Sequence, residues 1–205
     1  MELKKALEEL RKNEKRKFEQ SVDLIINLKG INPKKESIST IVSVPHKIKD
    51  KKVCAFFENP SNIVKTILKL DFPKYKDKKS LKKLAKEFDF FIASAPLMPA
   101  VATTFGKVLG PSGKMPSPQL GVVAKEDDAA VKPLLEKINK SIKIRVMQPC
   151  VKLAVAKEGM KDEEIIDNIK AVYNGLVNIL PAKKENIRNV MIKLTMSKPI
   201  KVEVQ

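Results

Sequence analysis

Two kinds of apolar pattern divide this chain into a middle part and two end parts. Near the ends, apolar and polar residues alternate in four segments: QSVDLIINL (20–28), ISTIVSV (38–44), CVKLAVAK (150–157) and NVMIKLTM (189–196). Such alternation predicts strands of an antiparallel sheet with one face in water. In the middle the apolar runs are continuous, VCAFF (53–57) and FDFFIASA (88–95), which is typical of parallel strands covered on both faces. Two different kinds of sheet are therefore expected in one chain.

Helix patterns fit this division. Periodic apolar residues predict helices over 3–17 and 162–180 beside the alternating strands, and Asp162 is placed to cap the second. In the middle part, Ser61 and Ser80 are placed to cap two further helices. A third helix is expected over 132–141, followed by the short strand KIRV (143–146).

The order of these elements predicts a discontinuous domain layout. Buried runs that alternate with helices indicate a largely parallel sheet with helices on both faces. The simplest arrangement is an α+β domain made from both ends of the chain, with an α/β domain inserted between Pro45 and Pro149. We therefore predict one domain over 1–47 and 150–205 and a second over 48–149, joined by two linkers that would act as a hinge.

Charge points to the class of partner. The chain has 41 lysines and arginines against 24 acids, a formal net charge of +17. Such an excess disfavours the compact state by self-repulsion, so a polyanionic partner is the expected reason for it, with simple solubility as the alternative. Two tyrosines and no tryptophan disfavour a platform that stacks unpaired bases. No apolar run approaches the length of a membrane span, and two distant cysteines indicate a reduced, cytoplasmic protein without membrane partners.

Catalytic signals are weak. His46 is the sole histidine, so neither a Ser-His-Asp nor a Cys-His arrangement is supported, and no enzyme activity or cofactor is expected. The glycine- and proline-rich loop 106–121 leaves one alternative open, a nucleotide-dependent enzyme that uses the loop as a phosphate cradle. Met115 stands where a P-loop needs a hydroxyl residue, and Pro116 and Pro118 interrupt the helix that would follow a KH-type GPSG turn. A rigid turn packed at a domain edge and a phosphate or RNA contact both remain possible for this loop.

Two basic segments place hydroxyl and apolar residues where water is expected. KRKFEQS (15–21) joins the first helix to the first strand, and KLTMSKP (193–199) ends an alternating strand. Lysines can bind phosphates while exposed Phe18, Thr195 and Met196 meet bases or ribose hydroxyls. The alternative for Phe18 and Met196 is packing in the core.

Three segments together resemble the ribosomal protein L1 family of the large subunit. They are KFEQSVDLIINLKGINPKK (17–35), LGPSGKMPSPQLGVV (109–123) and LTMSKPIKV (194–202). The resemblance implies a split α+β sandwich that carries the main RNA site and an inserted Rossmann-like three-layer α/β domain. It also implies a monomeric, ribosomal, cytoplasmic protein that binds stalk rRNA, assists release of exit-site tRNA and represses translation of its own mRNA.

The resemblance also implies site residues. The RNA site would contain Lys17, Phe18, Gln20, Ser21, Asn189, Thr195, Met196, Ser197 and Lys198. Interdomain or secondary RNA contacts would come from His46, Gly110, Gly113, Lys114 and Met115. Ser197 stands where the family has a glycine, which puts a close backbone approach to RNA at this position in question.

Overall fold

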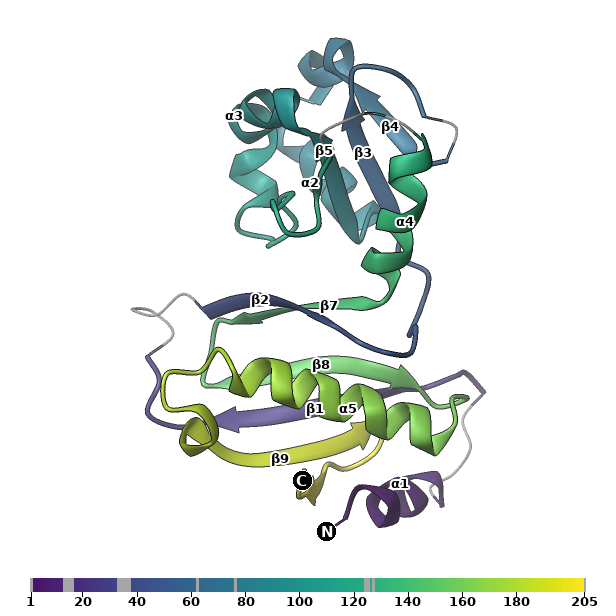
Figure 1. The fold of residues 1–205 in the computed structure, drawn as a ribbon, viewed down its shortest axis with the longest axis vertical. Coiled ribbons are helices and arrows are strands. Elements are labelled where there is room, and N and C mark those ends of the chain that lie inside the picture. The colour runs from purple at the N-terminus through teal and green to yellow at the C-terminus, as the bar shows by residue number, and fades with distance from the viewer. Residues whose placement is uncertain are drawn as a thin grey trace. The chain divides into compact units, whose positions relative to one another are not determined.

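The chain forms two compact units (Figure 1). The terminal unit comprises Met1–Ile48 and Lys140–Gln205, and the inserted unit comprises Lys49–Asn139. The computed structural model describes residues 2–12, 17–32, 38–61, 63–75, 77–123, 126 and 128–204, with the backbone alone at 78 and 128–130. Residues 13–16 of the predicted first helix lie outside these ranges, as do residues 33–37 between the first two predicted strands.

The terminal unit contains a four-stranded antiparallel sheet in the order β10-β9-β1-β8 and a two-stranded antiparallel sheet β2-β7. Its strands are β1 (Ser21–Leu28), β2 (Ile38–Ser43), β7 (Ser141–Val146), β8 (Cys150–Lys157), β9 (Ile187–Leu194) and β10 (Ile200–Val202). Its helices are α1 (Leu3–Arg11), α5 (Asp162–Val177) and the short 3-10 helix η3 (Lys183–Asn186).

One core joins these elements. Alternate residues of β1, Val22, Leu24 and Ile26, are buried together with Ile165, Ile169 and Val172 of α5, because the strand period of two sends every second side chain to the same face. Figure 1 shows α5 crossing the four-stranded sheet. The chain ends meet in a bridge between Glu2 and Glu203.

The inserted unit has a parallel sheet in the order β4-β3-β5-β6. Its strands are β3 (Val53–Phe57), β4 (Lys65–Leu68), β5 (Phe90–Ser94) and β6 (Val122–Val123). Its helices are α2 (Lys78–Glu87), α3 (Met98–Leu109), α4 (Asp128–Asn139) and the 3-10 helices η1 (Lys69–Tyr75) and η2 (Ala95–Leu97).

Both faces of this sheet are covered. Cys54 and Phe56 of β3 belong to a core with α2 and α3, whereas Val53, Ala55 and Phe57 belong to a second core with α4. A continuous apolar run is therefore needed, because every position of the strand is buried. The mixed α/β fold class predicted from the sequence is confirmed.

Three predictions of helices and their first residues differ from the structure. The segment after Ser61 forms β4 and η1 instead of a helix, because residues 65–68 pair in parallel with β3. Ser80 lies inside α2, which begins at Lys78. Lys161, rather than Asp162, is the N-terminal capping position of α5, and its N–H donates to Glu164 Oε2 at 3.2 Å.

Helix α3 lies in a segment for which no helix was predicted, between the apolar run 88–95 and the loop 106–121, and its last turn covers the start of that loop. Pro99 occupies the first turn of α3, where proline is tolerated because its missing N–H would have no partner there.

The strand over 141–146 also differs from its predicted position. It was assigned to the inserted domain, but β7 pairs antiparallel with β2 over six residue pairs and lies in the terminal unit. Its alternate residues Ile142, Ile144 and Val146 are buried in the terminal core. The observed boundary therefore lies between Asn139 and Lys140.

Candidate nucleic-acid interface

The two basic segments singled out in the sequence meet in the terminal unit. Because β1 and β9 are antiparallel neighbours, the start of one lies beside the end of the other. The N–H of Ser21 donates to Thr195 Oγ1 at 3.1 Å, and the N–H of Met196 donates to Gln20 Oε1 at 3.1 Å. Phe18 is two residues from Gln20, so its Cα lies within about 7 Å of that of Gln20.

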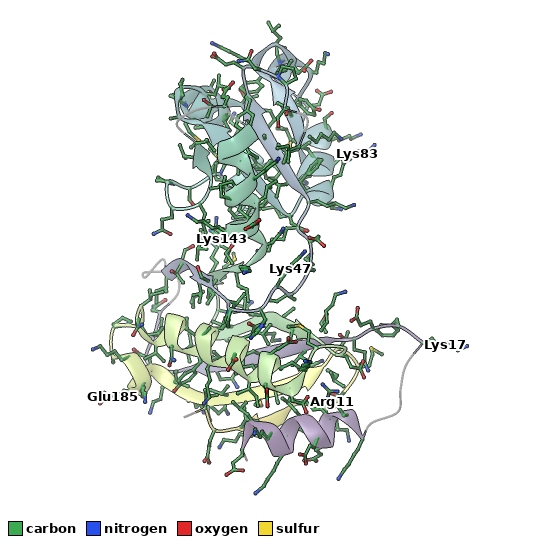
Figure 2. All side chains as sticks on the ribbon, turned by 45° about the vertical axis from the view of Figure 1, so that its right-hand side comes forward. Arg11, Lys17, Lys47, Lys83, Lys143 and Glu185 are labelled. Carbon is green, nitrogen blue, oxygen red and sulfur yellow. The ribbon has the colours of Figure 1, made fainter. Side chains whose placement is uncertain are left out.

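Lys17, Phe18, Ser21, Thr195 and Met196 are called the junction patch below. Phe18 is 52% exposed and Met196 is 62% exposed, so packing of these two side chains in the core is excluded. Lys17 is also exposed, and Figure 2 shows it extending outward from the segment that leads into β1. The patch thus exposes an ammonium group, an aromatic ring, a thioether and hydroxyl groups at the start of β1 and the end of β9.

Gln20 and Ser197 shape the patch from within. Gln20 is only 3% exposed, and its main chain exchanges hydrogen bonds with Glu158, whose Oε2 accepts from Gln20 N at 3.3 Å and whose N–H donates to Gln20 O at 2.8 Å. Ser197 Oγ accepts from Leu194 N at 2.8 Å and closes the turn after β9. Ser197 does not have a positive φ, so a serine fits this backbone without strain. Lys198 is exposed beside this turn.

Asn189 is not part of the junction patch. It lies on the same face of β9 as Thr195, but six residues earlier, which corresponds to about 20 Å along a strand. Its Oδ1 accepts a hydrogen bond of 2.6 Å from Asn27 Nδ2. The structure therefore separates this predicted site residue from the others.

The open face of the four-stranded sheet carries lysines that the motif comparison missed. Strand register places Lys152, Lys193 and Lys201 on this face, around Met191 and Ile25. These lysines could have been predicted from the sequence. They occupy polar positions of alternating segments, and alternate residues of a strand lie on the same face.

One acid, Asp23, interrupts this basic face. It lies opposite Lys193 in the pairing of β1 with β9. Burial raises the pKa of its carboxyl group, and the charge of Lys193 opposes that shift.

The loop 106–121 has a local structural role in the inserted unit. The N–H of Lys114 donates to Leu109 O at 2.9 Å, and the N–H of Gly113 donates to Gly110 O at 2.9 Å. With Gly113 at a φ of 68°, these bonds form a Schellman motif that closes the end of α3. Main-chain N–H groups of Gly110, Ser112, Gly113 and Lys114 are all bonded to carbonyls. These four N–H groups are therefore not free to bind a phosphate, as the cradle hypothesis would require.

Lys114 and Met115 fix the loop to its own unit. Lys114 Nζ donates to the carbonyl oxygens of Ala85 and Phe88, both at 2.8 Å, at the C-terminal end of α2. A cation there satisfies carbonyls that have no partner inside the helix. Met115 packs against the core shared by α2 and α3.

His46 is fixed to the terminal unit by a buried amide. Asn168 of α5 accepts from His46 N at 3.0 Å and donates to His46 O at 3.1 Å and to Val155 O at 3.0 Å. The imidazole Nε2 lies 3.4 Å from Asp167 Oδ2. These contacts anchor the chain just before it leaves the terminal unit.

Metal and thiol chemistry find little support in the described residues. Within them, no group of three or more His, Cys, Asp or Glu side chains is arranged to hold a metal ion. Burial raises the pKa of the Cys54 thiol to about 12, so the reactive thiolate is not formed near neutral pH. Among the helices that the structure describes, none has the length and apolar character to cross a bilayer.

The fold and the site define a strongly basic protein with two α/β units and a candidate RNA surface on the unit formed by both chain ends. Comparison with known proteins gives the family. The chain matches the model of the Ribosomal protein L1p/L10e family over residues 10–198, and it belongs to this family.

Three relatives are named Large ribosomal subunit protein uL1. The protein from Pyrobaculum calidifontis is 36% identical over 98% of this chain and 92% of its own length. The protein from Pyrococcus horikoshii is 35% identical over 92% of this chain and 89% of its own length, and the one from Thermococcus kodakarensis is 33% identical over 92% and 90%. All three of these relatives are archaeal proteins.

Family membership settles three of the predictions from sequence. The chain is a ribosomal protein rather than an enzyme, and its location is the ribosome in the cytoplasm. The large subunit is the part of the ribosome for which its relatives are named.

Proposed function

We propose that the terminal unit binds a folded region of large-subunit rRNA through the junction patch. The observation that carries this proposal is a pair of hydrogen bonds between the two basic segments. Ser21 N donates to Thr195 Oγ1 across 174 residues of sequence, and Met196 N donates to Gln20 Oε1 across 176 residues. These bonds hold two large apolar side chains in water beside hydroxyl groups and lysines. A protein that binds nothing there has no physical reason to keep such groups exposed together.

Recognition is by RNA shape. Lys17, Lys193 and Lys198 contact phosphates and fix the position of the RNA, which gives affinity without sequence selectivity. Phe18 and Met196 pack against sugar and base surfaces, and the Thr195 hydroxyl meets a ribose 2′-hydroxyl. Gln20 and Ser197 hold the backbone of the patch in place before RNA arrives, which lowers the entropic cost of binding.

We extend the proposal to three finer roles. The rRNA region is the mobile stalk, the protein assists release of deacylated tRNA from the exit site, and it represses its own mRNA when that mRNA carries a copy of the rRNA site. The autoregulatory role requires the same patch to bind both RNAs, so one substitution weakens both affinities by a similar factor.

Paired substitutions of exposed residues test the proposal. The full chain and its Phe18→Ala and Met196→Ala variants are titrated with a transcript of the stalk region of the rRNA. Each variant is expected to bind about tenfold to a hundredfold more weakly. Met147→Ala is the matched control, because Met147 is 66% exposed in the same unit but lies in the turn between β7 and β8.

The result that would overturn the proposal is equal affinity of Met196→Ala and Met147→Ala. A second check is salt: log affinity is expected to fall linearly with log salt concentration, by roughly 0.7–0.9 per phosphate neutralised. A flat salt response is incompatible with the roles given to the lysines.

A further inference from the structure

The inserted unit has an open groove between η1, α2 and α3 that the proposed RNA site does not use. Its volume is about 640 Å³, within the range of sites that bind an apolar anchor group. Its wall includes Lys69, Pro73, Leu81, Ala100, Lys107 and Val108. All of these residues belong to the inserted unit, so the groove exists whatever the position of the terminal unit.

An exposed leucine extends the apolar wall. In a 3-10 helix, residues three apart lie on the same side, so in η1 Leu70 lies over Pro73, just as Lys69 lies over Phe72. Leu70 is 86% exposed, the highest value among the large apolar side chains that the structure describes as exposed. An exposed apolar side chain on a helix that lines an apolar groove is typical of a protein-binding surface.

The charge at the groove is of one sign. Lys69 and Lys107 are exposed in its lining, which contains no carboxylate among its described residues. The nearby acid, Asp71, is already paired with Lys74 at 2.6 Å. Helix α2 adds exposed Lys82 and Lys83, and Figure 2 shows Lys83 projecting from the inserted unit.

The chemistry of the lining favours a protein segment over a nucleic acid. Base recognition would use an exposed aromatic face, but the one ring in the lining, Phe72, is buried and packs edge-on against Phe56 and Phe105. What the groove offers is aliphatic surface, a threonine hydroxyl at Thr104 and ammonium groups at the rim. An amphipathic helix with leucines on one face and carboxylates beside them complements both features.

We propose that this groove is a docking site for an acidic, amphipathic helix of a partner protein. The apolar face of the helix lies on Pro73, Ala100 and the accessible edges of Leu81 and Val108, and its carboxylates pair with Lys69 and Lys107. Leu70 closes over the bound helix. This interaction is independent of RNA binding by the terminal unit.

A synthetic peptide tests this proposal with the full chain. The probe is a fluorescent peptide with leucines at i, i+3, i+4 and i+7 and glutamates on the flanking positions, read by fluorescence anisotropy. The double variant Lys69→Glu/Lys107→Glu is expected to bind it at least about tenfold more weakly than the unmodified chain. The matched control is Lys132→Glu/Lys137→Glu on α4, which changes the net charge equally and packs on the opposite face of the sheet.

Two further measurements make the outcome decisive. Thr104→Trp, which fills the groove without changing charge, is expected to abolish binding, and a peptide with glutamine in place of glutamate is expected to bind at least about tenfold more weakly. Circular dichroism verifies that each variant is folded. The proposal is overturned if the two double variants lose binding equally, or if Thr104→Trp binds the peptide fully. A competition with a short oligouridine is the last check. If the oligouridine displaces the peptide, and if Lys69→Glu/Lys107→Glu weakens its binding, the groove binds RNA instead.

Discussion

The hydroxyl oxygen of Thr195 accepts a hydrogen bond of 3.1 Å from the main-chain N–H of Ser21, across 174 residues of sequence. The same hydroxyl lies 3.4 Å from Ser21 O. Thr195 therefore joins the entry of β1 to the exit of β9 while its side chain stays exposed. This relationship gives one side chain two separable effects, one on the local structure and one on ligand binding.

Replacement of Thr195 by valine separates these effects. Valine keeps the shape but leaves Ser21 N without its acceptor, in a partly wet position, so the free energy of unfolding is expected to fall by only about 0.5–1.5 kcal/mol. RNA binding is expected to weaken by about 1–3 kcal/mol, since the hydroxyl that would meet RNA is also lost. Denaturant unfolding and RNA titration measure the two quantities. Thr103→Val, which removes a hydroxyl bonded to Ala100 O at 2.9 Å in the inserted unit, is the control. If Thr195→Val binds RNA as strongly as Thr103→Val does, Thr195 is not part of the interface.

A second prediction concerns Lys114. Its Nζ donates to Ala85 O and Phe88 O, so Lys114→Met leaves two carbonyls at the end of α2 without a donor. The inserted unit is expected to lose about 1.5–3 kcal/mol of stability, while RNA affinity changes by less than about twofold. Lys137→Met on the exposed side of α4 removes the same charge without these bonds. A large loss of RNA affinity at unchanged stability would instead give Lys114 a direct role in RNA binding.

Strands and helices could be predicted from the sequence where their signals are local. Strands Ser21–Leu28 and Val53–Phe57 were predicted because burial determines the order of apolar residues along a strand. Burial of one face gives alternating apolar residues, and burial of both faces gives a continuous apolar run. Residues 65–68 also fit a helical period, and only their pairing with β3 decides that they form a strand. The strand 141–146 was placed in the wrong unit for the same reason, since its partner β2 lies about a hundred residues away.

The proximity of the candidate site residues was predicted in part. The motifs identified Phe18, Thr195 and Met196, and the register of two antiparallel strands brings them together. The burial of Gln20 could not be deduced, because it depends on Glu158 and Met196, which are remote in sequence. The separation of Asn189 from the patch could have been deduced, since six residues of strand cover about 20 Å.

A third prediction concerns close packing in the terminal unit. A Cβ atom at Gly175 of α5 would lie 2.5 Å from Cγ2 and 2.8 Å from Cγ1 of Val42. Valine on a strand has little freedom to turn away, so Gly175→Ala is expected to reduce stability by about 1–3 kcal/mol despite the better helix propensity of alanine. Gly106→Ala in α3, where a Cβ meets nothing within 4 Å, is expected to be neutral or stabilising by up to about 1 kcal/mol.

A double substitution checks the cause of this loss. In the Val42→Ala background the obstructing methyl groups are absent, so adding Gly175→Ala is expected to cost little or nothing, giving a coupling energy of about 1–2 kcal/mol. Thermal unfolding of the four proteins supplies the cycle. Additive losses would show that contact with Val42 is not the origin of the effect.

The last prediction concerns Lys51, whose Nζ donates to Ile138 O at 2.7 Å in the inserted unit. Burial lowers the pKa of its ammonium group to about 8, while Asp89 opposes this shift and Lys49 adds to it. An unfolded lysine titrates near 10.4, so between about pH 8 and 10.4 the unfolded chain holds a proton that the folded chain has released. Stability from this group therefore rises with pH through that window, because the unfolded state binds more protons.

Substitution of Lys51 by methionine is expected to remove this rise. On going from about pH 7 to about pH 10, the unmodified protein should gain about 1–2 kcal/mol relative to the variant. This gain is below the roughly 3 kcal/mol of the full shift, because the group is partly in water and screened. Denaturant unfolding at several pH values measures the difference in the free energy of unfolding between the two proteins. Other groups titrate alike in both proteins, so their contributions cancel in this difference. Lys52→Met, at an exposed neighbouring position, should follow the unmodified protein throughout. The contradicting result is the same change in the free energy of unfolding for Lys51→Met and the unmodified protein between these pH values. In that case the Lys51 ammonium does not titrate in this window, and its burial does not destabilise the folded inserted unit.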